Sequence, residues 1–342
     1  MTTRDRIVAG FRDAQRRLAA FFESPRGLLV RKVARALFLV AVLAYLLREF
    51  SAIGWRALAA SLPTAGGFYA IFLVLYFTLP VTESLIYRLC WGTSFGRSFF
   101  AFVKKRVYNK DFAGYSGEAY LFAWARRRVP LPDRQVLGII KDNVVLSGFA
   151  STAFAVSLLA LFAAFGDLEA LGLGGERSVL YVVGAAAVLV LLGVLGLRFR
   201  TRLFALPARM LALVFALHFG RLAAMNALQV VQWDLVIPGI GWQSWFVFLA
   251  VQVIISRLPL LPSRDLLFLG ASVELAERVG IPRAQMAAML VLLSAMDKAL
   301  NLVLFLAISA YNTWRPDPEL QEAAVPVAGD EPPDATLPRA TP

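Results

Sequence analysis

Charged side chains interrupt several long apolar segments of the sequence. A charge at the centre of a bilayer costs about 3 kcal/mol even on lenient insertion scales, so these positions predict either a functional role or pairing. The residues expected to form an intramembrane polar network are Glu83, Arg88, Lys141, Asp142, His218, Asp265, Glu274, Asp297 and Lys298. Arg221 follows His218 by one turn and has no acid within a turn, so an uncompensated cation there would suit a phosphate group.

Two pairs of sequence neighbours, Lys141 with Asp142 and Asp297 with Lys298, carry opposite charges. Adjacent residues do not face each other on a helix, so we expect each of the four to find a partner on another helix. Interhelical ion pairs that hold a bundle together are one interpretation. A direct role in binding is the other.

Two apolar stretches, 95–124 and 242–278, are each broken near the middle by charge, Pro or Gly. Irregular backbone at membrane depth needs protein or water around it, so each stretch predicts a re-entrant pair of half-helices rather than a crossing. Free N–H groups at the start of a half-helix would form an anion site at each turn, although an ordinary basic loop is the alternative. The residues expected to bind an anionic headgroup are Arg106, Tyr108, Asn109, Lys110, Gly117, Glu118, Arg221, Arg257 and Arg264.

The composition indicates that membrane-spanning helices position these side chains. Of 342 residues, 59% are hydrophobic, which is more than one soluble core can hide. The predicted fold is an all-α polytopic membrane protein with two re-entrant hairpins and six spanning helices at about 33–48, 68–90, 136–165, 178–197, 206–233 and 283–311. The net charge of +12 lies beside apolar spans, which favours anionic lipid over nucleic acid as the partner.

The distribution of basic residues predicts the topology. Residues 1–35 and 96–134 are rich in Lys and Arg, which places both on the cytoplasmic side of an inner, bacterial-type membrane. Residues 1–32 lack the apolar core of a signal peptide and are expected to form an amphipathic helix at the cytoplasmic surface. Residues 33–311 form the transmembrane domain, and the acidic, Pro-rich segment 312–342 is expected to be a disordered cytoplasmic tail.

A faint internal repeat appears when the chain is compared with itself at a spacing of about 150 residues. Trp91 aligns with Trp242, Arg106 with Arg257, Pro132 with Pro282, and Gln135 with Gln285. The repeat units would be about 68–165 and 206–311, each with a span, a broken hairpin and a span. Three crossings between their starts would invert one copy against the other, an architecture typical of transporters.

Signatures of enzymes are weak in this sequence. A single cysteine, Cys90, and a single histidine, His218, exclude a disulfide framework and the common multi-histidine metal sites. The Gly-x-Ser-x-Gly and Walker motifs are also missing. We therefore expect no catalytic residue, metal or cofactor, and leave open whether the protein forms a homo-oligomer.

Several motifs resemble those of one membrane family. They are the run Arg97 to Arg128, Leu-Pro pairs within 257–262, and Gly280-Ile-Pro282-Arg followed by a helix with Asp297. Together they resemble the transmembrane, flippase-like domain of lysyl-phosphatidylglycerol synthases over about residues 33–311, in a free-standing form. The resemblance implies a helical bundle that moves an anionic lipid or lipid-linked intermediate between leaflets.

The sequence departs from that family at two points. Ser294 stands where the family commonly has an Arg three residues before the Asp matching Asp297, which leaves an intrahelical ion pair without its cation. The soluble aminoacyl-transferase domain of the synthases is also not found after the last span. Two other functions stay open: an enzyme acting on a phospholipid or polyprenyl phosphate, and a non-catalytic membrane partner of a lipid-modifying enzyme.

Overall fold

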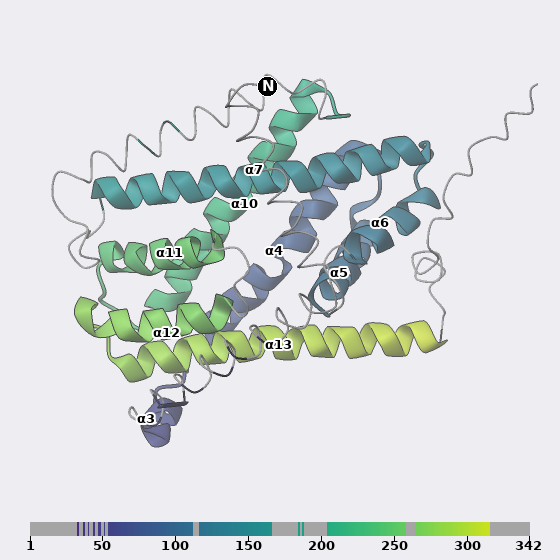
Figure 1. The fold of residues 1–342 in the computed structure, drawn as a ribbon. Coiled ribbons are helices and arrows are strands. Elements are labelled where there is room, and N and C mark those ends of the chain that lie inside the picture. The colour runs from purple at the N-terminus through teal and green to yellow at the C-terminus, as the bar shows by residue number, and fades with distance from the viewer. Residues whose placement is uncertain are drawn as a thin grey trace, which may run out of the picture. The chain divides into compact units, whose positions relative to one another are not determined.

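The computed structural model describes residues 54–111, 116–165, 204–257 and 264–314, with isolated helical positions between 33 and 51 and at 184 and 187. Every element in these ranges is a helix (Figure 1), which confirms the all-α prediction for the described part of the chain. The elements are α3 (Trp55–Ala60), α4 (Gly66–Trp91), α5 (Phe95–Asp111), α6 (Ser116–Arg126), α7 (Asp133–Phe165), α10 (Ala208–Asp234), α11 (Trp242–Arg257), α12 (Arg264–Ala276), the 3-10 turn η2 (Glu277–Val279) and α13 (Arg283–Trp314).

Four of these helices are long and apolar enough to cross a membrane: α4, α7, α10 and α13. Only 6% of the most apolar window of α13 is buried within the protein. An apolar surface left this open is typical of contact with lipid. The four helices match predicted spans. The predicted spans 33–48 and 178–197 lie outside the described residues apart from isolated positions, as do the N-terminal helix and the tail after Trp314.

The two broken stretches each form a pair of short helices. The pairs are α5 with α6 and α11 with α12, and the two helices of each pair contact one another. Their lengths of 17, 11, 16 and 13 residues are below the roughly 20 that a crossing needs. The break predicted near the middle of 95–124 lies between the end of α5 at Asp111 and the start of α6 at Ser116. Arg106, Tyr108 and Asn109 are therefore helical residues.

The order of helices repeats along the chain. The lengths of α4 to α7 are 26, 17, 11 and 33 residues, and those of α10 to α13 are 27, 16, 13 and 32. Pro132 and Pro282 take the same place, since each carbonyl accepts the backbone N–H three residues later, at 2.8 and 3.0 Å. The other two aligned pairs are not equivalent. Trp91 ends α4 whereas Trp242 begins α11. Arg106 and Arg257 stand at different turns of their helices.

The chain divides into two compact units. Unit 1 is Met1–Val74, Ala153–Leu191 and Ala224–Met296, and unit 2 is Leu75–Thr152, Leu192–Ala223 and Asp297–Pro342. The core of unit 1 is aromatic: the Trp233 ring lies 5.7 Å from that of Trp245 and 6.1 Å from that of Phe268. In unit 2, the Tyr87 ring of α4 stacks on Phe102 of α5 at 5.0 Å. This contact fixes α5 against α4, where the polar residues of unit 2 gather.

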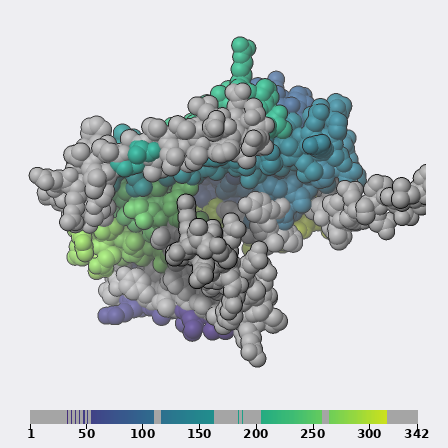
Figure 2. Space-filling model, turned by 45° about the horizontal axis from the view of Figure 1, so that its top comes forward, coloured from purple at the N-terminus to yellow at the C-terminus, as the bar shows by residue number. Residues whose placement is uncertain are grey.

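The basic end of α6 is exposed. Arg126, Arg127 and Arg128 are open to solvent, and the blue segment that holds α6 and the start of α7 reaches the surface in Figure 2. Arg126 forms an exposed ion pair with Asp133 at 3.1 Å. Such a cluster at the end of an apolar segment is typical of a headgroup region.

Candidate functional site

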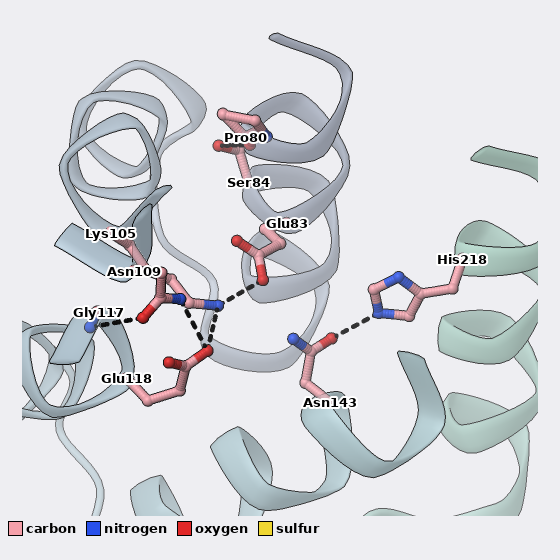
Figure 3. A network of polar contacts seen from close by, with 9 residues as sticks. All are labelled: Pro80, Glu83, Ser84, Lys105, Asn109, Gly117, Glu118, Asn143 and His218. Atoms are coloured by element: carbon pink, nitrogen blue, oxygen red, sulfur yellow. Dashed lines mark hydrogen bonds and ion pairs between the residues drawn. The ribbon is translucent and has the colours of Figure 1, made fainter. Parts of the chain in front are cut away.

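A buried ion network connects α4, α5 and α6 within unit 2 (Figure 3). Its centre is Lys105, whose side chain is 5% exposed. The ammonium group donates to Glu83 on α4 and lies 3.4 Å from Oε1 of Glu118 on α6. Burial lowers the pKa of Lys105, but the charges of Glu83 and Glu118 raise it by more, so its pKa lies above the ordinary value. Lys105 therefore stays protonated between two carboxylates.

Helical spacing and one glycine bring these groups together. Lys105 and Asn109 are four residues apart on α5 and so share a face. Asn109 Nδ2 donates to Glu118 Oε1 at 3.3 Å, and the Gly117 N–H donates to Asn109 Oδ1 at 2.8 Å. A Cβ on Gly117 would lie 2.7 Å from Asn109 Oδ1 and closer still to the Lys105 carbonyl oxygen. Only glycine lets α6 start this close to α5.

The sequence predicts free N–H groups for an anion at the start of α6, but the Gly117 N–H there is already bonded within the protein. The Asn109 amide already accepts the Gly117 N–H, and the Ser116 hydroxyl donates to the Tyr108 carbonyl at 2.8 Å. The Tyr108 ring packs against Tyr120 with the centroids 5.2 Å apart, so its role is in the core. The side chain of Lys110 lies outside the described part.

A cavity of about 180 Å³, lined mostly by polar and charged residues, opens onto this network. Its lining residues are Leu79, Glu83, Lys105, Arg106, Asn109, Glu118, Asn143, Val144 and Ser147. At about 30 Å³ per water this is room for roughly six water molecules. The cavity can therefore hold a phosphate-sized group but not a whole lipid with its acyl chains.

Arg106 is the lining cation that is held most loosely. Its guanidinium group stacks over the Tyr76 ring at 4.3 Å, and Nη2 is 3.9 Å from Asp297 Oδ1 on α13. Its Nε is buried and has no hydrogen-bond partner within the described residues. An anion in the cavity, in addition to the Asp297 carboxylate, could form bidentate hydrogen bonds with the Arg106 guanidinium, as phosphates do with Arg. The structure thus brings Asp297 and Arg106 together, as sequence analysis expected for residues with partners on other helices.

A second buried polar pair includes one residue that lines the cavity, Asn143. His218 of α10 is fully buried, and its Nε2 is 2.9 Å from Oδ1 of Asn143 on α7 (Figure 3). Arg221, one turn further along α10, is half-buried, and the charges of Glu83 and Arg106 act on it in opposite directions. The interpretation of Arg221 as a cation for a phosphate group stays a prediction.

Asp142 has a structural role in unit 2. Its buried Oδ2 accepts the backbone N–H groups of Ala205 and Leu206, at 2.7 and 2.8 Å, just before α10 begins. Lys141 Nζ lies 3.3 Å from Oδ1 of its neighbour Asp142, a contact that the spacing of adjacent helical residues did not predict. The partners of Asp142 at Ala205 and Leu206 lie outside α7, and a partner of Lys141 on another helix stays a prediction.

Other predicted network residues lie at the surface of their own unit. Arg88 and Lys298 are exposed in unit 2. In unit 1, Glu274 forms an exposed ion pair with Arg283 at 3.0 Å rather than a buried contact. Arg257, Arg264 and Asp265 are exposed at the helix ends that flank 258–263, which lie outside the described residues. These six side chains do not belong to the buried network of unit 2.

Sequence analysis missed the central residue of the site. Lys105 sits in the run Lys104-Lys105-Arg106, which has the pattern of a cytoplasmic loop. Its four-residue spacing to Asn109 was the available signal, because it places both polar groups on one face of a helix. Asn143 and Ser147, also four apart, repeat that pattern on α7 and line the same cavity.

No family model, curated protein or solved structure matches this chain.

Proposed function

We propose that this chain moves an anionic phospholipid or lipid-linked intermediate between the leaflets of an inner, cytoplasm-facing membrane. The observation that supports this most directly is the buried charged network between the membrane-length helix α4 and the short helices α5 and α6, opening onto a cavity lined mostly by polar and charged residues. Ionisable groups within membrane spans are expensive and typically mark a substrate or ion pathway. The loosely held Arg106 supplies the hydrogen-bond donors that an anionic headgroup needs.

The size of the cavity favours a lipid headgroup over a whole drug-sized solute. A volume of about 180 Å³ accommodates a phosphate group but no acyl chain. Soluble drug-sized ligands usually occupy pockets of about 300–1,000 Å³. A headgroup that enters while its acyl chains stay in the bilayer fits this size.

The repeated order of long, short, short and long helices also supports a transporter. Inverted repeats with discontinuous helices allow access to alternate around a site near the middle of the membrane. Our proposal includes re-entrant hairpins, six crossings and cytoplasmic termini, as the distribution of basic residues predicts. The resemblance to the flippase-like domain of lysyl-phosphatidylglycerol synthases adds the same lipid class.

A second function, an enzyme acting on a phospholipid or polyprenyl phosphate, is favoured by one feature of Glu118. Its Oε2 is buried and has no hydrogen-bond partner within the described part of the chain, and the residue lines the cavity. A carboxylate in that position could serve as a general base. A third function, a non-catalytic partner of a lipid-modifying enzyme, would use the terminal segments, which lie outside the described residues.

Reconstitution distinguishes the first two functions. Purified protein is placed in vesicles that contain fluorescently labelled phosphatidylglycerol, and transfer to the outer leaflet is followed by chemical quenching. We expect protein-dependent transfer, reduced about 10- to 100-fold in Arg106→Gln, because a charge-assisted hydrogen bond is worth about 1.5–3 kcal/mol. Arg209→Gln, which changes an exposed arginine on α10, is the matched control.

The same vesicles are then analysed by mass spectrometry. Labelled lipid that crosses unchanged supports the transporter. A chemically altered lipid in vesicles that show no transfer would contradict the transporter and support the enzyme. Equal transfer by wild type and Arg106→Gln would remove Arg106 from the pathway.

A further inference from the structure

The charges around the cavity of unit 2 balance. Among the described residues, the interactions found there join three cations and three anions: Lys105, Arg106, Arg221, Glu83, Glu118 and Asp297. Tyr87 and Cys90 on α4 and His218 on α10 are titratable groups of the same part of unit 2. A singly charged phosphodiester that enters this site would leave one excess negative charge. An uncompensated buried charge is strongly unfavourable, so the site needs a compensating change.

Lys105, the central cation, cannot bind the anion without breaking an existing contact. Lys105 is shared between Glu83 and Glu118, and its side chain is 5% exposed. An anion that reached the ammonium group would have to displace one of these carboxylates. A displaced and still ionised carboxylate would then repel the anion in a poorly solvated space.

Glu118 is the carboxylate best placed to be neutralised. Its Oε1 is held by two long contacts, 3.3 Å from Asn109 and 3.4 Å from Lys105. Its Oε2 is buried and has no hydrogen-bond partner within the described residues. The side chain is 19% exposed, against 8% for Glu83, so water reaches it more easily. A proton on Oε2 would break no hydrogen bond of the described network and would provide a donor for the anion.

The Glu118 carboxylate lies beside two sources of positive charge. It is the third residue of α6, where the positive end of the helix dipole stabilises a carboxylate. Lys105 adds a second positive charge at 3.4 Å. The anion therefore weakens the stabilisation of the Glu118 carboxylate only when it draws Lys105 or Arg106 toward itself.

We propose that binding of an anionic headgroup beside Arg106 and Lys105 is coupled to protonation of Glu118, so that one proton crosses with one singly charged anion. The proton is taken from solvent: one O–H bond of a hydronium ion breaks as the Oε2–H bond forms, which leaves a neutral water molecule. The reverse transfer to water occurs when the anion is released. This inference rests on the proposed function and adds its coupling ion. It predicts that the pH difference across the membrane drives lipid movement.

Calorimetry on the full chain in detergent tests the coupling. The probe is dihexanoyl phosphatidylglycerol, titrated at pH 7 in two buffers with different ionisation enthalpies, and dihexanoyl phosphatidylcholine corrects for mixing with the micelle. We expect about one proton taken up per anion bound, with an affinity that falls about tenfold per pH unit above the protonation range of the empty site.

Variants of Glu118 test whether this residue binds the proton. Glu118→Gln carries a neutral side chain of the same shape, so we expect it to bind the anion with no proton uptake and with an affinity independent of pH. Glu277→Gln makes the same change on an exposed side chain and should keep the wild-type behaviour. Glu118→Asp retains a titrating group and should keep proton uptake, which serves if the Gln variant does not fold.

Each outcome decides between the two proposals. Anion binding without proton uptake in the wild type overturns the coupling and leaves the lipid transporter standing. Proton uptake that persists in Glu118→Gln places the proton elsewhere and overturns the role of Glu118. Equal heats for phosphatidylglycerol and phosphatidylcholine would mean that no anion binds, which overturns the proposed function itself.

Discussion

Replacing Lys105 with Met tests whether the buried ion network holds α4, α5 and α6 together. Met keeps the apolar stem and removes the charge, so Glu83 and Glu118 would face each other without a cation. At the 3.4 Å separation from Glu118, the attraction lost is about 5 kcal/mol with an effective dielectric constant of about 20. Desolvation of the ammonium group offsets part of this, and removing one partner of a buried pair typically costs about 3–5 kcal/mol.

The expected loss is therefore about 3–5 kcal/mol in the free energy of unfolding, and it should depend on pH. Lowering the pH protonates a carboxylate in the folded variant before it does so in the unfolded chain. The folded state then binds more protons, so the stability of Lys105→Met should recover as the pH falls. The measurement is reversible unfolding in mixed micelles, followed by tryptophan fluorescence at pH 8 and pH 5.

A double-mutant cycle separates pairing from packing. Glu83→Gln in the Lys105→Met background removes one of the two carboxylates, so it should restore part of the lost stability. In the wild type the same change should be destabilising. Additive effects of the two substitutions would refute the argument that Lys105 and Glu83 are coupled across the interface between α4 and α5. A loss below about 1 kcal/mol for Lys105→Met would show that the site is well solvated.

Three smaller changes test the local structure, each by the same unfolding assay. Gly117→Ala should cost about 1–3 kcal/mol because its Cβ has no room against α5, whereas Gly220→Ala on α10, where nothing lies within 4 Å, should be neutral or stabilising. Asp142→Asn should cost about 1 kcal/mol, since it weakens acceptance of two amides before α10, and an unchanged midpoint would contradict that role. Asn143→Ala should cost about 1–3 kcal/mol because it leaves His218 Nε2 buried without its partner, and no change would mean that water replaces the amide.

The hydropathy of the sequence was enough to locate the long helices. α4, α7, α10 and α13 all match predicted spans to within a few residues. Their length and apolar character are properties of consecutive residues, which the sequence displays directly. The breaks in the two shorter stretches were predictable for the same reason, because Gly, Pro and clustered charge act on the local backbone.

The partners of the charged residues were not predictable in the same way. Sequence analysis placed Arg106, Asn109, Gly117 and Glu118 in one site. In the structure Arg106, Asn109 and Glu118 line the cavity, and Gly117 donates to Asn109. The sequence suggested an open turn there, whereas Arg106 and Asn109 belong to α5, which also turns Lys105 inward, and Gly117 and Glu118 belong to α6.

The sequence by itself therefore determined the class of the protein, the positions of its long helices and the side chains that are costly to place in a membrane. Only the tertiary structure decided which of those charges meet. Lys105 pairs with Glu83, 22 residues earlier in the chain, because Tyr87 and Phe102 stack and so fix α5 against α4. Hydropathy depends on neighbours along the chain, but an ion pair depends on the packing of faces from separate helices, and no local pattern encodes that packing.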